Sequence, residues 1–433
     1  MTLKEKIGSK NAKVGIIGLG YVGLPLAVEV AKAGFQTLGF DHNEEKVGLI
    51  NKGESYVEDI DAQIIKELIE KGKLKATEDF SFIEEQDVVC ICVPTPLGPS
   101  QEPDISAIIS ASEQISKHLR NGSLIILEST TYPGTTEEVV LPILQNNGRK
   151  VEENFFLGYA PERVDPGNKK YTLGNTPKVV SAIGGEAKEL TKLFYSQICA
   201  RVICLSSPKA AEMTKLLENI FRCVNIALVN ELMVLCDRMG INIWEVVEAA
   251  STKPFGFMPF YPGPGLGGHC IPVDPFYLSY KAREYDFHTE FIELAGKINE
   301  NMPYYVVSKI SEALNKDKKS INGSKILILG VAYKRDISDT RESPAIKIIE
   351  LLLKEGAAVS YHDPYVEELR VGNKAFRSQL LNEDVLRASD CAAIITDHSN
   401  VVYEQVAACA QQIVDMRNVV RLRYQVLETP GID

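Results

Sequence analysis

The chain has 433 residues, 45% of them hydrophobic and 24% charged, and a formal net charge of −11. This length predicts two or three domains, and the composition is that of a globular protein. The acidic balance argues against nucleic acid as the main partner, because binding to phosphates needs a basic surface. No uninterrupted apolar run reaches the roughly 18–20 residues of a membrane helix, and the charged N-terminus does not read as a signal peptide. We therefore expect a cytoplasmic protein without a membrane partner.

The nine cysteines form no CxxC pair and have no metal-like spacing with the six histidines. Cys90 and Cys92 lie in an apolar run, where we expect them to be buried. The pattern predicts reduced thiols, which suits the cytosol, and no metal site.

Residues 13–41 predict a strand, a turn, a helix and a second strand. The apolar run from Val14 to Ile17 enters a glycine turn, and a helical pattern then continues to about Lys32. The second apolar strand stops at Asp41. A strand–turn–helix–strand unit of this length is typical of a nucleotide-binding fold.

Gly18, Gly20 and Gly23 have the GxGxxG spacing, and Asp41 follows Gly18 by 23 residues. Such glycines let a pyrophosphate approach the N-terminus of the helix, where free N–H groups favour anions. The Asp41 carboxylate would accept hydrogen bonds from the ribose hydroxyls of adenosine and would repel a 2′-phosphate. The motif therefore predicts an NAD site rather than an NADP site.

Two further apolar strands are expected within residues 87–96, "DVVCICVPTP", and residues 123–130, "SLIILEST". Strands that alternate with helical stretches predict a doubly wound parallel sheet with ligands at the carboxyl ends of its strands. Thr95 and Thr130 stand at two such ends, where they can touch a cofactor. The alternative is that both are ordinary turn or cap residues.

The C-terminal part repeats this layout. A strand is expected over residues 325–329, followed by a turn at Gly330, a helix from about Ser343 and a strand that reaches Asp363. The glycine fingerprint is missing, and a charged insertion, "YKRDISDTRES", stands in its place. The insertion carries the basic residues Lys334, Arg335 and Arg341. These residues can hold a different phosphate ligand, and we expect no second NAD site there.

A helix is predicted from about Ser206 to Met239, since apolar residues recur at intervals of three and four. At about 1.5 Å per residue it is roughly 45 Å long, enough to join two domains and to pair with a second chain. We expect it to carry a homodimer interface. Lys215 and Asn219 lie on one face of it, although a solvated face is the commoner reason for such a pair.

Residues 263–276 read "GPGLGGHCIPVDPF" and place Cys270 after four glycines. Glycine runs mark places where something approaches the main chain closely. We expect a substrate there, with an inert buried thiol as the alternative.

The motifs "GIIGLGYVGLPLA", "VPTP", "EST", "APER", "EMTKLLEN", "GPGLGGHCIPVDP" and "YKRDISDTRES" occur in this order. Together they resemble the UDP-glucose/GDP-mannose dehydrogenase family from about Lys13 to Val419. His269 before the cysteine and Val273 before Asp274 look most like the branch that oxidises UDP-N-acetylated hexosamines. The resemblance thus favours UDP-N-acetylglucosamine, with UDP-glucose, UDP-N-acetylgalactosamine and UDP-N-acetylmannosamine as alternatives.

The resemblance implies oxidation of the sugar C6 alcohol to a carboxylate with two NAD. Cys270 would add to the intermediate aldehyde, and the resulting thiohemiacetal would be oxidised to a thioester that water then hydrolyses. Lys215 and Asn219 would stabilise the oxyanion at C6. His269 would contribute shape or a hydrogen bond rather than act as a base.

Three further catalytic roles follow from the matching motifs. Asp274 would position or deprotonate a water with help from Thr130, and Glu162 of "APER" would act as the acid or base in hydrolysis. A structural ion pair of Glu162 with Arg163 or another base is the alternative. Which of Glu162, Asp274 and Lys215 takes the first proton stays open.

The resemblance also assigns binding residues. Lys334 and Gly267 would contact the UDP-sugar, together with Glu162, Lys215 and Asn219. Arg341 would reach the cofactor phosphates and Lys46 the adenosine ribose, although a solvated charged loop is the alternative for Lys334 and Arg341. The remaining cofactor contacts would be Gly18, Gly20, Tyr21, Val22, Gly23, Asp41, Pro94, Thr95 and Thr130.

We therefore expect an α/β chain with two Rossmann-like doubly wound parallel-sheet domains joined by a long central helix. The predicted domains are an NAD-binding domain over 1–205, a central helical domain with the cysteine loop and a dimer interface over 206–310, and a UDP-sugar-binding domain over 311–433. A homodimer or a higher homo-oligomer is expected. A two-electron hydroxyacid dehydrogenase would not need Cys270, and a non-catalytic NAD-binding protein would lack the cysteine, lysine or aspartate.

Overall fold

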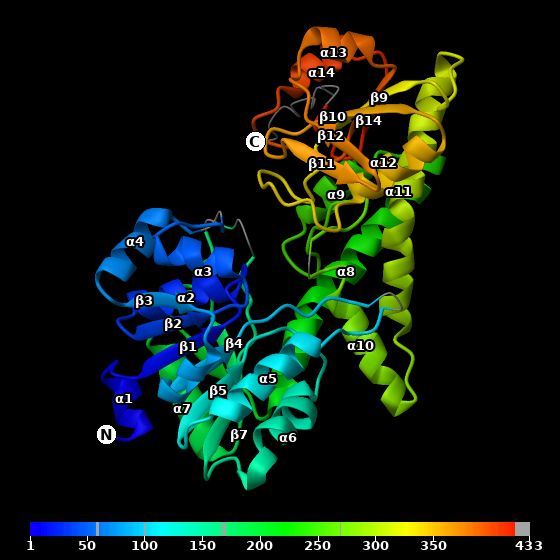
Figure 1. Ribbon diagram of the computed structural model, residues 1–433. Coiled ribbons are helices and arrows are strands. Elements are labelled where there is room, and N and C mark those ends of the chain that lie inside the picture. The colour runs from blue at the N-terminus through cyan, green and yellow to red at the C-terminus, as the bar shows by residue number, and fades with distance from the viewer. Residues whose placement is uncertain (58–59, 99–100, 166–167, 169, 269, 421–433) are drawn as a thin grey trace, which may run out of the picture. The chain divides into compact units, whose positions relative to one another are not determined.

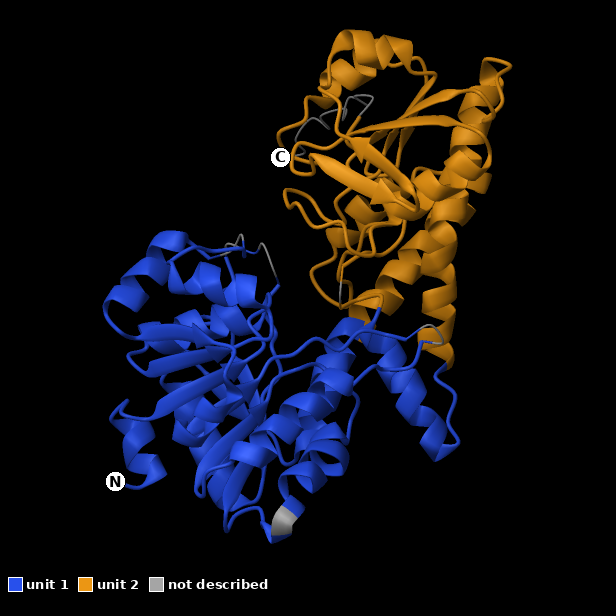
Figure 2. Cartoon of the chain, in the orientation of Figure 1, with its two compact units in different colours: residues 1–219, 273–289 blue, residues 220–272, 290–433 orange. Residues whose placement is uncertain are grey.

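The structure is a computed structural model that describes residues 1–57, 60–98, 101–165, 168, 170–268 and 270–420 (Figure 1). The chain divides into two compact units, residues 1–219 with 273–289 and residues 220–272 with 290–433 (Figure 2). Each unit has its own sheet and its own hydrophobic core.

The first unit contains a sheet of eight strands. They are β1 (Lys13–Ile17), β2 (Gln36–Phe40), β3 (Leu74–Thr77), β4 (Val88–Ile91), β5 (Ser123–Leu127), β6 (Phe155–Tyr159), β7 (Lys178–Ile183) and β8 (Val202–Cys204). Their order is β3-β2-β1-β4-β5-β6-β7-β8, and only β6 and β7 pair antiparallel. The predicted parallel sheet is confirmed over β1 to β6. The reversal at β7 was not predicted, because strand direction leaves no mark on a short apolar run.

Helices cover both faces of this sheet. The helices of the first unit are α1 (Leu3–Gly8), α2 (Gly23–Lys32), α3 (Glu44–Asn51), α4 (Ala62–Glu70), α5 (Ser106–His118), α6 (Leu141–Leu144), α7 (Gly185–Ser196) and α10 (Asp274–Ala282). One face packs against α2, α4 and α7, and the other packs against α5 and α6. Every residue of β4 and β5 is buried, as expected for parallel strands covered on both sides. The doubly wound arrangement is therefore confirmed.

The long helix α8 (Pro208–Met239) begins in the first unit and ends in the second. The prediction of one unbroken helix is confirmed, with its start two residues later than expected. Among the described residues α8 alone is long and apolar enough to cross a membrane, judged by length and composition. This differs from the expectation that no segment qualifies, because scattered charged residues interrupt the apolar run without lowering its average much. One such helix is weak evidence for a membrane span, and 33% of its most apolar stretch is buried within the structure.

The second unit contains a smaller sheet and a separate two-stranded ribbon. Its strands are β9 (Lys325–Leu329), β10 (Ala358–His362), β11 (Glu368–Val371), β12 (Lys374–Arg377), β13 (Cys391–Ile394) and β14 (Ile413–Asp415). The sheet has the order β10-β9-β13-β14 with all pairs parallel, and β11 pairs antiparallel with β12. The second Rossmann-like fold is thus confirmed, in reduced form.

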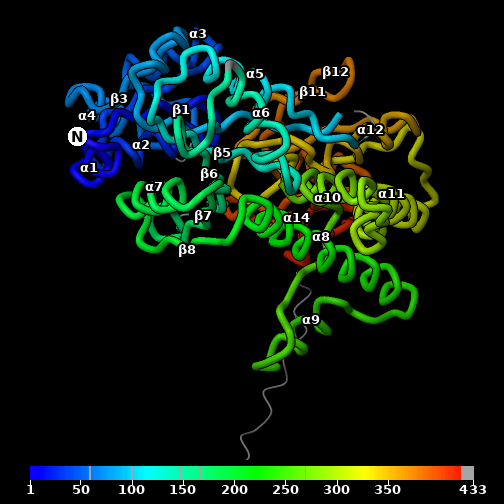
Figure 3. The backbone as a smooth tube through the Cα atoms, turned by 90° about the horizontal axis from the view of Figure 1, so that it is seen from below, coloured from blue at the N-terminus to red at the C-terminus, as the bar shows by residue number. Residues whose placement is uncertain are grey.

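The helices of the second unit are α9 (Ile243–Ser251), α11 (Glu290–Lys316), α12 (Pro344–Lys354), α13 (Glu383–Ala388) and α14 (Tyr403–Cys409). Helices α11 and α12 cover one face of the sheet, and α13 and α14 cover the other. Helix α12 starts where predicted, because the Ser343 hydroxyl accepts a hydrogen bond from the Ala345 amide at 3.3 Å. After α8 the chain turns back through α9 and a loop (Figure 3), and Trp244 of α9 stacks on Tyr261 of that loop.

Candidate active site

The glycine turn after β1 has the geometry of a dinucleotide site. A Cβ on Gly18, whose φ is +87°, would meet the Cys92 carbonyl oxygen at 2.7 Å, and one on Gly23 would meet the Gly18 carbonyl oxygen at 1.8 Å. A Cβ on Gly20 would meet nothing within 4 Å. Gly18 and Gly23 are therefore required by the fold, whereas Gly20 keeps space open above the turn. Since no side chain caps the first turn of α2, its N–H groups can receive a pyrophosphate.

Asp41 lies beside this turn at the end of β2. Its Oδ2 accepts a hydrogen bond from the Leu19 amide at 2.9 Å, and its Oδ1 accepts one from the Asn43 amide at 3.0 Å. The Lys46 Nζ is 4.0 Å from Asp41 Oδ2 and 5.7 Å from the centre of the Tyr56 ring. Asp41 and Lys46 are thus brought together, as their expected roles at one ribose require.

Two more expected cofactor residues meet at the carboxyl edge of the sheet. The Thr95 hydroxyl donates a hydrogen bond to the Thr130 carbonyl oxygen at 2.8 Å. Pro94 beside it is exposed, and Tyr21 in the glycine turn is 48% exposed. The loops after β4 and β5 are therefore tied together beside the turn, where ligands bind in sheets of this kind.

Helix α8 presents its predicted polar pair on the buried side. Lys215 is 7% exposed, and Asn219, one turn later, is fully buried. The Asn219 side-chain amide donates to Asp274 Oδ2 at 2.5 Å. Asp274, the first residue of α10, is 4% exposed. The structure thus connects two of the expected catalytic residues directly.

A buried carboxylate missed by the sequence prediction holds the loop after Thr130. Glu212, three residues before Lys215, accepts hydrogen bonds from the Gly134 and Thr136 amides at 2.6 and 2.9 Å. The Thr136 hydroxyl also donates to Glu212 at 2.6 Å. Burial raises the pKa of Glu212, and these hydrogen bonds oppose that rise. Glu212 therefore fixes the loop after β5 to the same helix that carries Lys215.

Glu162 does form an ion pair, but with a lysine that the sequence analysis did not single out. Lys178 Nζ lies 3.1 Å from Glu162 and 2.7 Å from Glu128. Arg163 instead pairs with Glu218 of α8 at 2.6 Å. In the sequence these two partners are marked only as charged residues beside an apolar strand: Glu128 directly follows the strand in "SLIILE", and Lys178 begins the strand "KVVSAI".

Cys270 belongs to the second unit and is partly exposed. The glycines before it are crowded by protein, since a Cβ on Gly267 or Gly268 would lie 2.6 or 2.8 Å from the side chain of Tyr333. The Gly268 amide also donates to the Arg341 carbonyl oxygen at 3.1 Å. The close approach that these glycines allow is therefore, at least in part, to the charged insertion of the same unit, and not to a substrate alone as expected.

The insertion carries the remaining predicted residues. Lys334 is partly exposed four residues after Gly330. The Arg341 guanidinium makes a two-pronged ion pair with Asp339 in the same loop, at 2.6 and 2.9 Å. The packing of Gly267 and Gly268 thus brings the cysteine loop against the insertion that holds Lys334 and Arg341. His269 lies outside the described residues.

The first sheet has a glycine turn suited to a dinucleotide. The second sheet has the same plan, and the cysteine loop packs against the insertion that follows its turn. Together these features define a nicotinamide-dependent dehydrogenase. Residues 12–200 match the NAD binding domain of the UDP-glucose/GDP-mannose dehydrogenase family, residues 209–301 its central domain and residues 327–422 its UDP binding domain. The chain belongs to this family. It is an NAD-dependent oxidoreductase that acts on a UDP-sugar.

Relatives within the family differ in the sugar that they are named for. The chain is 39% identical to the UDP-N-acetyl-D-glucosamine 6-dehydrogenase of Pseudomonas aeruginosa, over 82% of this chain and 84% of that protein. It is 35% identical to the UDP-N-acetyl-D-mannosamine dehydrogenase of Pyrococcus horikoshii, over 94% and 96%. A solved structure of UDP-D-ManNAc dehydrogenase from that archaeon matches with a TM-score of 0.86 and 34% identity, covering 95% of this chain and 96% of that one.

Proposed function

We propose that the chain oxidises the C6 alcohol of UDP-N-acetyl-D-glucosamine to the uronic acid, with consumption of two NAD. The relative from Pseudomonas aeruginosa supports this sugar, as do His269 and Val273 in the cysteine loop. UDP-N-acetyl-D-mannosamine is the second candidate, because relatives named for it match over more of the chain. UDP-glucose and UDP-N-acetylgalactosamine remain alternatives.

The main support for the proposed chemistry is the packing of the cysteine loop against the charged insertion. Gly267 and Gly268 pack on Tyr333, and the Gly268 amide bonds to the insertion at Arg341. This places Cys270 two residues from a contact with the loop where Lys334 would hold the UDP-sugar. A thiol beside the substrate loop can add to an aldehyde and hold it as a thiohemiacetal. Covalent capture keeps the aldehyde from escaping before its second oxidation.

NAD, when bound at the glycine turn, accepts a hydride in each oxidation. Lys215 and Asn219 would stabilise negative charge on the C6 oxygen, since donors in a dry site act strongly on a developing oxyanion. Asp274 would hold or deprotonate the hydrolytic water with Thr130. Glu162 would serve as the base in thioester hydrolysis, since its side chain is partly exposed and its surroundings keep the carboxylate ionised by holding its pKa below the usual value.

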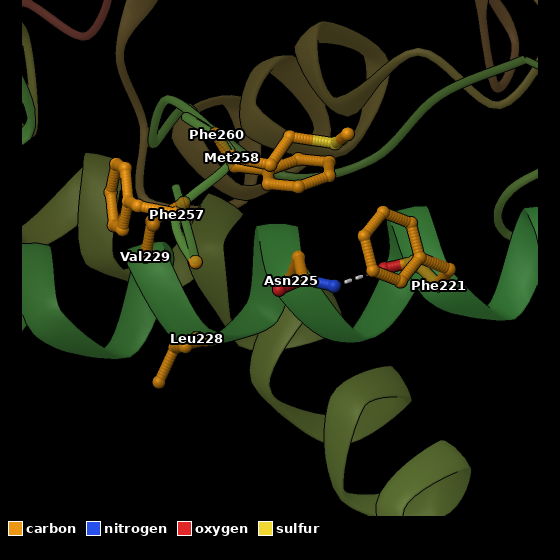
Figure 4. Close-up of a pocket in the computed structure, with 8 residues that line it drawn as sticks. Phe221, Asn225, Leu228, Val229, Phe257, Met258 and Phe260 are labelled. Carbon is orange, nitrogen blue, oxygen red and sulfur yellow. Dashed lines mark hydrogen bonds between the residues drawn. The ribbon is translucent and has the colours of Figure 1, made fainter. Parts of the chain in front are cut away.

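We further propose that the chain works as a homodimer that pairs through an apolar face of α8. Phe221, Leu228, Leu232, Leu235 and Met239 are each between 37% and 62% exposed. With Asn225 they follow the alternating spacing of three and four that lets two helices pair. Beside them lies a groove of about 510 Å³, which Phe257, Met258 and Phe260 line from the loop after α9 (Figure 4). A cytoplasmic location stays a prediction from the free, mostly buried cysteines.

The yield of NADH from limiting substrate tests the reaction. UDP-N-acetylglucosamine, UDP-N-acetylmannosamine, UDP-N-acetylgalactosamine and UDP-glucose would be compared in parallel. Two NADH per UDP-N-acetylglucosamine, with slower turnover of the others, is the expected result. Preference for another sugar would overturn the specificity and keep the mechanism, whereas one NADH per sugar would overturn the four-electron reaction.

The variant Cys270→Ser tests the covalent step in the same assay. It is expected to lose the second NADH, since a hydroxyl without an activating base is a poor nucleophile. Cys204→Ser is the control, because Cys204 is also partly exposed but lies on β8 of the other unit. Two NADH from Cys270→Ser would show that the cysteine is not the nucleophile.

A further inference from the structure

A buried charged cluster lies beneath the loop that carries Glu162. The side chains of Glu128 and Lys178 are 0% and 3% exposed, and that of Glu162 is 14% exposed. The ammonium of Lys178 donates to both carboxylates, at 2.7 Å to Glu128 and 3.1 Å to Glu162. The Tyr195 hydroxyl donates to the other oxygen of Glu128. One buried cation is thus shared by two carboxylates.

The orientation of Glu162 is fixed through both of its oxygens. Oε1 accepts hydrogen bonds from the Arg163 and Val164 amides at 2.6 and 2.7 Å, and Oε2 accepts the bond from Lys178. The Arg163 side chain is held in turn by Glu218 and by the Pro177 carbonyl oxygen. A carboxylate with three donors in fixed positions is held ionised, since each donor favours the charged form.

We propose that Lys178 is a positioning residue that keeps Glu162 ionised and oriented to take a proton from water during thioester hydrolysis. This inference rests on the function proposed above. In that step water adds to the thioester carbonyl, the carbon–sulfur bond breaks and its electron pair leaves with the Cys270 sulfur. One proton of the water passes to Glu162, and the other is released with the carboxylate product or taken by the thiolate.

The electrostatics of the cluster support this role. Burial alone would raise the pKa of Glu162, but the charge of Lys178 and the backbone N–H groups hold it below its usual value. Burial raises the pKa of Glu128 in spite of the same lysine. The surroundings therefore move the pKa values of the two carboxyl groups apart, as in sites where one of a pair must act as a base. When the pH falls, Glu128 takes the first proton and leaves Lys178 to Glu162 alone.

The other titratable groups around the cluster do not replace Lys178. Those that face it are the thiol of Cys90 on β4, the thiol of Cys92 directly after β4, the thiol of Cys199 after α7, the phenol of Tyr195 on α7 and the Arg163–Glu218 pair. Burial raises the pKa of the Cys90 and Cys92 thiols and of the Tyr195 phenol far above their usual values, so all three stay neutral. Lys178 is accordingly the cation that holds Oε2 of Glu162.

The pH dependence of turnover distinguishes positioning from a merely structural role. In Lys178→Met only the Arg163 and Val164 amides still oppose the effect of burial on Glu162, so the acidic limb of the kcat profile is expected to move up by about 1–3 pH units. Glu128→Gln disturbs the same cluster but keeps the lysine, so its acidic limb is expected to stay at the wild-type pH. Lys150→Met removes an exposed lysine that pairs with Glu153 and controls for the loss of a surface charge.

Pre-steady-state NADH formation separates this inference from the proposed function. Glu162→Gln is expected to release two NADH per site in a burst and then to turn over about 10²–10⁴-fold more slowly, because only hydrolysis is affected. If Glu162→Gln turns over like the wild type, the proposed role of Glu162 is wrong. If it is slow while Lys178→Met keeps the wild-type acidic limb, the role of Lys178 is wrong.

Two more variants keep the inference testable if Lys178→Met fails to fold. The double variant Glu128→Gln/Lys178→Met leaves one buried carboxylate without the lysine instead of two, and the same upward shift of the acidic limb is expected. Lys178→Arg keeps the cation, and a limb nearer to the wild type is expected. A double variant with the wild-type limb would overturn the inference.

Discussion

Asn219 on α8 donates its side-chain amide to the carboxylate of Asp274 on α10 at 2.5 Å, and both side chains are buried. The bond joins residues 55 positions apart in the chain. It fixes the carboxylate proposed to handle the hydrolytic water to the helix proposed to stabilise the oxyanion. Loss of this one donor should therefore affect both stability and catalysis.

The variant Asn219→Ala tests this bond. It leaves a buried carboxylate short of one donor, which costs about 1–3 kcal/mol of the free energy of unfolding. We expect a lower Tm and a kcat reduced by about 10²-fold or more, since a misplaced catalytic group loses that much. Asn315→Ala on the exposed side of α11 is the control for removing an asparagine. An Asn219→Ala enzyme with wild-type kcat would exclude a catalytic role for the pair.

The glycine turn offers two alanine substitutions with opposite consequences. A Cβ on Gly20 meets no protein atom within 4 Å, whereas one on Gly23 lies 1.8 Å from the Gly18 carbonyl oxygen. Gly20→Ala should keep the wild-type Tm and weaken NAD binding by about tenfold or more, because the methyl group occupies the approach to the pyrophosphate. Gly23→Ala should lower the Tm. Thermal unfolding and titration with NAD measure both, and unchanged affinity in Gly20→Ala would place the pyrophosphate elsewhere.

The second sheet repeats the acid at the end of its second strand but uses it differently. Asp363 is 3% exposed, and its Oδ2 accepts hydrogen bonds from the Val331 and Ala332 amides at 2.7 and 3.0 Å. His398 lies 3.0 Å from the same oxygen through Nε2, while its Nδ1 accepts a bond from the Asp336 amide. The Leu19 amide is bound to Asp41 in the same way in the first unit, but Asp363 also accepts the second turn amide and lies against His398. The acid of the second sheet is therefore held by more groups of the chain than its counterpart in the first sheet.

Asp363 should make the second unit sensitive to acid. Burial alone would raise its pKa, but the hydrogen bonds from His398 and the turn amides hold it below the usual value. A carboxyl whose pKa is lower in the folded state stabilises the fold above its unfolded pKa of about 3.9, and this stability is lost as the pH falls through the folded pKa.

We expect Asp363→Asn to lower the stability of the second unit by about 1–3 kcal/mol at neutral pH. The difference from the wild type should shrink as the pH falls below about 4, where the wild-type carboxyl also loses its charge. Calorimetric unfolding at several pH values measures it, with the exposed Asp384→Asn on α13 as the control. If Asp363→Asn is less stable than the wild type by the same amount at every pH, the charge of Asp363 contributes nothing to the free energy of unfolding.

The elements were predictable where one local pattern decides them. The strand over 325–329 and the helix after Ser343 appear where expected, because an apolar run and a cap residue mark them. The 27-residue helix α11 was not predicted, and it contains Pro303, a residue that usually ends a helix pattern. Its buried face supplies packing that the local sequence does not reveal.

The candidate site was predictable for residues inside motifs and not for the residues that hold them. Glu162 was found in "APER", but its partner Lys178 lies 16 positions later in the chain. Glu128, the second partner of Lys178, lies 50 positions before that lysine. Nothing in a local pattern says which distant segments meet. The crowding of Gly267 by Tyr333 was missed for the same reason, since 66 residues separate them.

The proposed homodimer depends on the exposed apolar face of α8 within the second unit. Leu228 and Leu235 are 52% and 50% exposed and stand seven residues apart, two turns of the helix. Two such helices would bury these side chains against each other, and Asn225, three positions before Leu228, would help to set the register.

Leu228→Glu and Leu235→Glu should each convert the dimer to a monomer. A carboxylate forced into an apolar helix pair costs several kcal/mol unless it is paired, so about a 10²-fold or larger loss of dimer affinity is expected. Sedimentation velocity over a range of protein concentrations measures the effect. Leu380→Glu is the matched control, because Leu380 is 80% exposed but lies in the loop before α13. If both α8 variants sediment as the wild type, the chain pairs through another surface.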